Sequence, residues 1–82
     1  MTKNNTMPKK IYISNLPPDI TQQDVKDLFT AFGTVLSLTL QTDRRGTLTG
    51  AFLNMADAEA DRAIHALDGV QYDGRSLTIS EA

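Results

Sequence analysis

The sequence alternates between two periodicities of apolar residues, and the order of the alternation limits the chain to few folds. Apolar side chains recur at every second residue, the period of a half-buried strand, near residues 11–16, 35–40, 48–55 and 76–80. Between the first and second segments, and again between the third and fourth, they recur at the i, i+3, i+4, i+7 spacing of an amphipathic helix. The predicted order is strand, helix, strand, strand, helix, strand.

The two helical segments carry start and stop signals. Thr21 is a suitable N-cap for the first helix, and Asp24 three residues later completes a variant of the capping box. Gly33 is expected to follow this helix in the left-handed conformation. Asp57 is expected to cap the second helix, and Gly69 to stop it. The apolar stripes consist of Val25, Leu28, Phe29 and Phe32 in the first helix, and of Ala60, Ala63, Ile64 and Leu67 in the second.

The order of elements predicts the fold class. Each helix connects two strands as a right-handed crossover, which places both helices on one face of the sheet. The prediction is an α+β fold, a ferredoxin-like βαββαβ sandwich with a four-stranded antiparallel sheet and two helices on one face. Residues 9–82 are expected to form this single domain, and the polar residues 1–8 a flexible N-terminal tail.

Period two assigns each strand residue to one of two sheet faces. The face under the helices should take Ile11, Ile13, Leu36, Leu38, Leu40, Ala51, Leu53, Met55, Leu77 and Ile79. The open face should then carry two aromatic rings among small polar side chains. Exposed rings suit stacking with unpaired bases, worth about 1 to 3 kcal/mol per base. The expected open face comprises Tyr12, Ser14, Ser37, Thr39, Leu48, Gly50, Phe52, Thr78 and Ser80.

Two strand segments resemble the signatures of a known family. Residues 11–16, with the sequence IYISNL, resemble the hexamer of the RNA recognition motif family, and residues 48–55, LTGAFLNM, resemble its octamer. Both occur in order on a βαββαβ frame, and the similarity covers residues 9–82. The single motif with a short tail also resembles small bacterial RNA-binding proteins of this family.

The resemblance implies that Tyr12 and Phe52 each stack on one base of single-stranded RNA. The family carries a third aromatic residue at the position of Gly50, and a lysine or arginine at the position of Leu48; this chain has neither. We expect Leu48 to lie exposed beside the rings, and a Gly50→Phe substitution to tighten binding. With two rings only, binding should be weak and sequence-tolerant, with dissociation constants of about 1 to several hundred micromolar.

Further RNA contacts are expected around the two rings. Acidic residues fall mostly on the helices, which leaves the sheet rim with a modest positive bias despite a net charge of −2. The Asn15 amide is also expected to fix the turn after the first strand, and Arg75 to bond turn carbonyls. The expected phosphate or base-edge contacts are Lys9, Lys10, Ser14, Asn15, Thr39, Arg44, Arg45, Thr78 and Ser80.

The sequence offers no residues suited to catalysis or to metal binding. It has no cysteine and one histidine, His65, which excludes disulfides, thiolate metal sites and multi-histidine sites. Acylphosphatases share the ferredoxin-like fold but need an arginine-bearing, phosphate-cradling loop after the first strand, where this chain has Pro17-Pro18-Asp19. We therefore expect no enzyme activity, no cofactor and no metal.

Two functions remain open from the sequence. One is binding of single-stranded RNA, with single-stranded DNA as a further ligand. The other is a protein-interaction module of the same fold, whose sheet face docks a peptide or a partner domain through Leu48 and its neighbours. No apolar run suits a membrane span or a signal peptide. We therefore expect a monomer in the cytoplasm, or in the nucleus if the source is eukaryotic.

Overall fold

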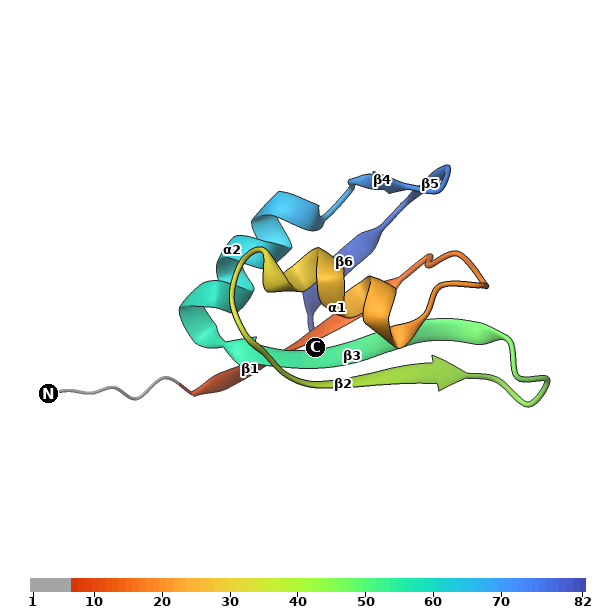
Figure 1. Cartoon of the computed structure of the whole chain (residues 1–82), viewed down its shortest axis with the longest axis horizontal. Helices are drawn as coiled ribbons and strands as arrows, with labels where there is room; N and C mark the ends of the chain where they lie inside the picture. Colours follow the sequence, from red (N-terminus) through yellow and green to blue (C-terminus); the bar gives the residue numbers. More distant parts are fainter. Residues whose placement is uncertain (1–6) are drawn as a thin grey trace, which may run out of the picture.

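A computed structural model describes residues 7–82 of the chain (Figure 1). Eight helices and strands follow one another along these residues. Pro8, which the sequence analysis places in the tail, is the first residue of the first strand; the rest of the predicted tail lies almost wholly outside the described residues. The elements are β1 (Pro8–Ser14), α1 (Gln22–Thr30), β2 (Val35–Thr42), β3 (Leu48–Ala56), α2 (Asp57–Leu67), β4 (Gln71–Tyr72), β5 (Arg75–Ser76) and β6 (Thr78–Glu81).

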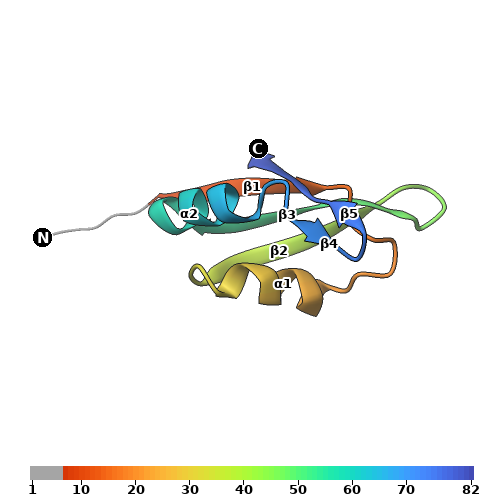
Figure 2. The ribbon, with the colours of Figure 1, turned by 90° about the horizontal axis from the view of Figure 1, so that it is seen from above.

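Four strands form one antiparallel sheet in the order β2-β3-β1-β6, and β4 and β5 form a separate short hairpin. Both helices lie on the same side of the main sheet (Figure 1). Seen from above, α1 runs along β2, and α2 lies over the strands at the centre (Figure 2). The predicted ferredoxin-like βαββαβ sandwich is confirmed. Within residues 7–82, the opposite face of the sheet carries no helix.

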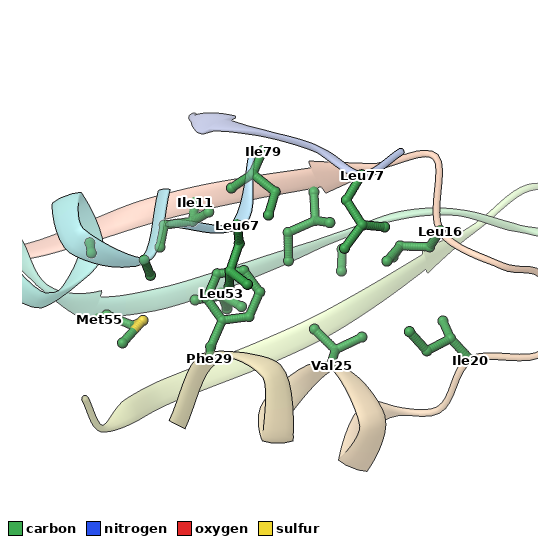
Figure 3. Packing of buried hydrophobic residues seen from close by; sticks show 14 residues of the cluster. Ile11, Leu16, Ile20, Val25, Phe29, Leu53, Met55, Leu67, Leu77 and Ile79 are labelled. Atoms are coloured by element: carbon green, nitrogen blue, oxygen red, sulfur yellow. The ribbon is translucent and has the colours of Figure 1, made fainter. Parts of the chain in front are cut away.

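The core fills the space between the helices and the sheet (Figure 3). Phe29 and Val25 of α1 are fully buried against Ile11, Ile13 and other strand residues. Replacing a buried phenylalanine such as Phe29 with alanine typically costs about 3 to 5 kcal/mol of stability. The buried hydrophobic residues are Ile11, Ile13, Leu16, Ile20, Val25, Phe29, Ala51, Leu53, Met55, Ala60, Ala63, Leu67, Leu77 and Ile79.

The capping box of α1 is confirmed. The Asp24 backbone N–H donates to the Thr21 hydroxyl, and the Thr21 N–H donates to the Asp24 carboxylate. The prediction for Gly33 is wrong in detail, because Ala31 is the C-cap and Gly33 follows two residues later with φ of +157°. A Cβ at Gly33 would collide with the carboxylate of Glu59, which accepts a hydrogen bond from the Thr34 N–H.

Helix α2 begins one residue earlier than a cap at Asp57 would require. Its N-cap is Ala56, which has no capping side chain, and Asp57 is the first helical residue. The Asp57 carboxylate instead lies 2.9 Å from the Lys9 ammonium. At the other end of α2, Asp68 is the C-cap and its carboxylate accepts a hydrogen bond from the Ile79 N–H, which joins the helix to β6.

Two irregularities in the β2–β3 pairing overturn two face predictions. The register passes from Val35↔Met55 to Ser37↔Asn54, so Leu36 is an extra residue in β2. Leu36 is therefore 56% exposed instead of buried, and Val35 packs against the core. A bulge of this kind shifts the alternation of faces by one residue.

The second irregularity lies at the start of β3. The register passes from Gln41↔Gly50 to Thr42↔Leu48, so Thr49 is the extra residue. Leu48 consequently packs against the core and is not exposed on the open face as predicted.

Candidate functional site

The centre of the open sheet face is one row of directly opposed residues, one from each strand. Thr39 of β2 pairs with Phe52 of β3, Phe52 pairs with Tyr12 of β1, and Tyr12 pairs with Ser80 of β6. Tyr12, Phe52 and Ser80 are next to buried residues of the opposite face, and the neighbours of Thr39 in β2 are partly buried and pack against the core. Alternation therefore directs all four residues of the row away from the helices. The structure thus brings together two aromatic rings flanked by two hydroxyl groups.

Tyr12 and Phe52 form a contacting aromatic pair. Their ring centroids lie 4.9 Å apart, and the ring planes are inclined at 42°. Both side chains are half-buried. No helix covers this face, so the outer surfaces of the rings are available for a planar, apolar ligand group. The placement of both rings on the open face was predicted from the sequence and is confirmed; their direct pairing is seen in the structure.

Gly50 lies diagonally across from Tyr12 and is buried, because the tyrosine side chain leans over it. A Cβ built on Gly50 would lie 2.8 Å from the Tyr12 hydroxyl oxygen and 2.8 Å from the Ile13 carbonyl oxygen. Both distances are shorter than normal contacts. The position of the missing third aromatic residue is therefore not an empty slot, and another side chain does not fit there without movement of the neighbours.

Two adjacent lysines of β1 point to opposite faces. Lys10 is opposite Asn54 and follows the alternation of Tyr12, so it belongs to the open face. Its ammonium nitrogen lies 5.6 Å from the centroid of the Phe52 ring, within cation–π range.

Lys9 lies on the helix side of the sheet and forms ion pairs with three carboxylates. This corrects its predicted role as a phosphate contact. Its ammonium lies 2.6 Å from Asp61, 2.9 Å from Asp57 and 3.5 Å from Glu81. The hydrogen bonds that the Lys9 ammonium donates to Asp61 and Asp57 raise the pKa of Lys9 well above its usual value. Lys9 therefore joins β1 to α2 and β6.

The arginines between β2 and β3 lie in an ordered loop. The Asp43 carboxylate accepts hydrogen bonds from the backbone N–H groups of Arg45 and Thr47, at 2.8 and 3.0 Å. Both arginine side chains, Arg44 and Arg45, are exposed. Within residues 7–82 every ion pair involves Lys9, so the charges of Lys10, Arg44 and Arg45 are not neutralised there by carboxylates.

Asn15 has a structural function that the sequence analysis anticipated. Its backbone adopts a positive φ of 64°, and its amide nitrogen donates to the Ser76 carbonyl oxygen at 2.8 Å. Arg75 donates to the Asn15 side-chain oxygen, and not to a turn carbonyl as predicted. These bonds engage both polar atoms of the Asn15 side chain in holding the turn.

The remaining predicted contacts surround the rings with hydroxyl groups. Ser14 of β1 pairs with Thr78 of β6 on the open face, and Thr39 and Ser80 lie at the two ends of the central row. The sequence analysis did not include Asn54 in the site, although it lies two residues after Phe52 and thus on the same face. The Asn54 amide nitrogen donates to the Ser37 hydroxyl at 2.7 Å.

Within residues 7–82 no group of three histidine, aspartate or glutamate side chains is arranged to hold a metal ion. The same residues contain no helix that is long and apolar enough to cross a membrane.

Comparisons with known proteins agree on one family. The family model described as RNA recognition motif matches residues 11–78. The RbpF protein of Nostoc sp. is 43% identical over 75 residues, which cover 88% of this chain and 71% of RbpF. The RbpA protein of Synechocystis sp. is 40% identical over 75 residues and covers 88% of this chain and 74% of RbpA.

Among solved structures, this chain is similar to the RNA15 RRM with bound RNA (GU). The two superpose with a TM-score of 0.78 at 28% identity, over 89% of this chain and 81% of the other.

Proposed function

The chain belongs to the RNA recognition motif family, and from this premise we propose that it binds single-stranded RNA on the open sheet face by base stacking. Tyr12 and Phe52 each stack on one base in this proposal. The observation that carries it is the contacting pair of rings at the centre of a sheet face that no helix covers. The names of both bacterial relatives refer to RNA binding, and the RNA15 domain was solved with RNA.

Lys10, Arg44 and Arg45 form no ion pair within residues 7–82, and their positive charges can attract the phosphates of an RNA strand. Arg44 and Arg45 are exposed in a loop whose backbone is held by hydrogen bonds to the Asp43 carboxylate, so little backbone ordering is needed when they contact phosphates. Lys10 lies closer to the rings. Each neutralised phosphate of a single strand contributes about 0.7 to the salt dependence, so two or three contacts give a slope of about −1.4 to −2.1.

The binding we propose is weak and sequence-tolerant. Two stacked bases supply roughly 2 to 6 kcal/mol in total, and ordering a flexible strand removes several kcal/mol of it. The hydroxyl groups of Ser14, Thr39, Thr78 and Ser80 both donate and accept, so they accommodate different base edges. We expect dissociation constants of about 1 to several hundred micromolar.

An NMR titration tests the proposal directly. Isotopically labelled protein is titrated at low salt with a pool of short single-stranded RNAs of mixed sequence. We expect shifts in the amide signals of Tyr12, Thr39, Phe52, Ser80 and the Arg44–Arg45 loop, with signals of α1 and α2 unmoved. Shifts confined to the helices, or a spectrum that does not change up to millimolar RNA, would contradict sheet-face binding.

Docking of a protein partner on the sheet face was the alternative from the sequence. It depended on an exposed Leu48 beside the rings, and Leu48 packs against the core. No other observation on the open face favours protein docking over RNA binding. Protein docking is therefore the function to test only if RNA causes no change in the NMR spectrum.

A further inference from the structure

The Lys10 ammonium is the nearest positive charge to the predicted base-stacking position on Phe52. It lies 5.6 Å from the ring centroid, and among residues 7–82 no carboxylate pairs with it. A base stacked on Phe52 has its centroid about 4.5 to 7 Å from the ring centroid and so occupies the region in which the ammonium lies. Displaced to the edge of the base, the ammonium can donate hydrogen bonds to it.

An ammonium group donates hydrogen bonds and cannot accept them. At C4 of a pyrimidine or C6 of a purine it is attracted to the keto oxygen of uracil or guanine, and it is not satisfied by the amino group that cytosine or adenine carries there, which also donates. One N–H of the neighbouring Asn54 amide is engaged with the Ser37 hydroxyl at 2.7 Å. Lys10 carries the positively charged N–H donors at this end of Phe52.

We propose that Lys10 makes the Phe52 position selective for uracil and guanine, which carry a keto oxygen at C4 or C6, over cytosine and adenine, which carry an amino group there. The inference rests on the proposed function, because it requires a base stacked on Phe52. The inference adds a base preference to the site, because the hydroxyl groups around the rings both donate and accept and so favour no particular base. Lys10 contacts the base in this proposal, whereas Arg44 and Arg45 contact phosphates.

Oligouridine and oligocytidine of equal length test the proposal, because they carry the same phosphates and differ in the base edge. The wild-type protein should bind oligouridine about three- to tenfold more tightly, the effect of one exposed charge-assisted hydrogen bond. In Lys10→Gln, whose amide both donates and accepts, the ratio should fall towards one. Lys10→Arg, which only donates, should keep it.

Lys26→Gln is the matched control, because it removes the same charge from an exposed position on α1. It should leave the ratio between the two oligonucleotides unchanged. The second N–H of the Asn54 amide could also donate to a keto oxygen, and Lys10→Gln leaves it in place. A preference for oligouridine that survives in Lys10→Gln would therefore overturn the assignment to Lys10.

Two other outcomes separate this inference from the proposed function. If Lys10→Gln weakens both oligonucleotides equally and lowers the salt slope by about 0.7, Lys10 contacts phosphate and the inference is wrong while RNA binding stands. If neither oligonucleotide binds the wild-type protein, or if Phe52→Ala changes neither affinity, stacking on Phe52 is wrong, and the inference falls with it.

Discussion

The phenol ring of Tyr12 lies over Gly50, so the position without a side chain on β3 is covered from the neighbouring strand. The Tyr12 hydroxyl oxygen and the Ile13 carbonyl oxygen would each lie 2.8 Å from a Cβ at Gly50. The first atom belongs to a side chain that can rotate, and the second to the backbone. Glycine is therefore required by packing at the centre of the sheet, and the aromatic platform consists of two rings that are already in contact.

Substitutions at Gly50 should lower stability and should not improve RNA binding. Gly50→Ala should cost about 1 to 3 kcal/mol, the usual cost of overpacking, and Gly50→Phe should cost more. This outcome replaces the gain in affinity that the sequence alone suggested. Urea unfolding of both variants checks it. In a Tyr12→Ala background the cost of Gly50→Ala should fall, because one of its two close contacts is removed.

Loss of either ring should weaken RNA binding with a smaller effect on the fold. Tyr12→Ala and Phe52→Ala should each cost about 1 to 3 kcal/mol of binding free energy, the value of one stacked base. Fluorescence anisotropy with a labelled RNA measures this, and circular dichroism confirms that the variants are folded. Leu36→Ala is the control, because it removes an exposed apolar side chain from β2 outside the central row. Equal affinities for Phe52→Ala and wild type would refute stacking on that ring.

Lys9 should make the stability of the protein depend on pH in the alkaline range. Its pKa in the folded state is raised above the ordinary value of 10.5 by hydrogen bonds to Asp61 and Asp57. The folded state therefore keeps this proton at pH values where the unfolded state loses it, and the contribution of Lys9 falls as pH rises above 10.5. Below that pH the contribution is fully present. Urea unfolding at pH 8 and pH 11 should show a larger loss for wild type than for Lys9→Met. An equal loss in both proteins would mean that the carboxylates do not hold the proton.

The sequence predicted the fold and the two rings because both depend on periodicity. Alternation places Tyr12 and Phe52 on the face away from Ile11 and Leu53, and the order of the strands makes β1 and β3 neighbours. A bulge inserts one residue without changing the composition of the strand. The exposure of Leu36 and the packing of Leu48 against the core, each the reverse of the predicted face, therefore could not be predicted from alternation alone.

The opposite faces of Lys9 and Lys10 could have been predicted from the sequence. Alternation continues back from Tyr12 to Lys10 and assigns Lys9 to the helix face, once β1 is known to begin at Pro8. Because β1 was predicted to begin near Ile11, the alternation was not extended to the two lysines. The carboxylates that surround Lys9 come from α2 and β6, and their positions depend on how the helix packs on the sheet. The contact between Tyr12 and Gly50 likewise depends on a side-chain rotamer, which periodicity does not specify.

The arginines of the β2–β3 loop should contribute to RNA affinity through charge alone. Arg44→Gln and Arg45→Gln should each weaken binding to RNAs of every sequence by a similar factor, and each should lower the magnitude of the salt slope by about 0.7. Stability should hardly change, because the loop is held by the Asp43 carboxylate and backbone groups and not by the arginine side chains. Titrations at several salt concentrations measure the slope. Arg62→Gln, an exposed arginine on α2, is the charge-matched control and should leave the slope unchanged. If the loop variants alter base preference while the salt slope stays constant, the arginines read bases and not phosphates, and the division of roles between this loop and Lys10 is wrong.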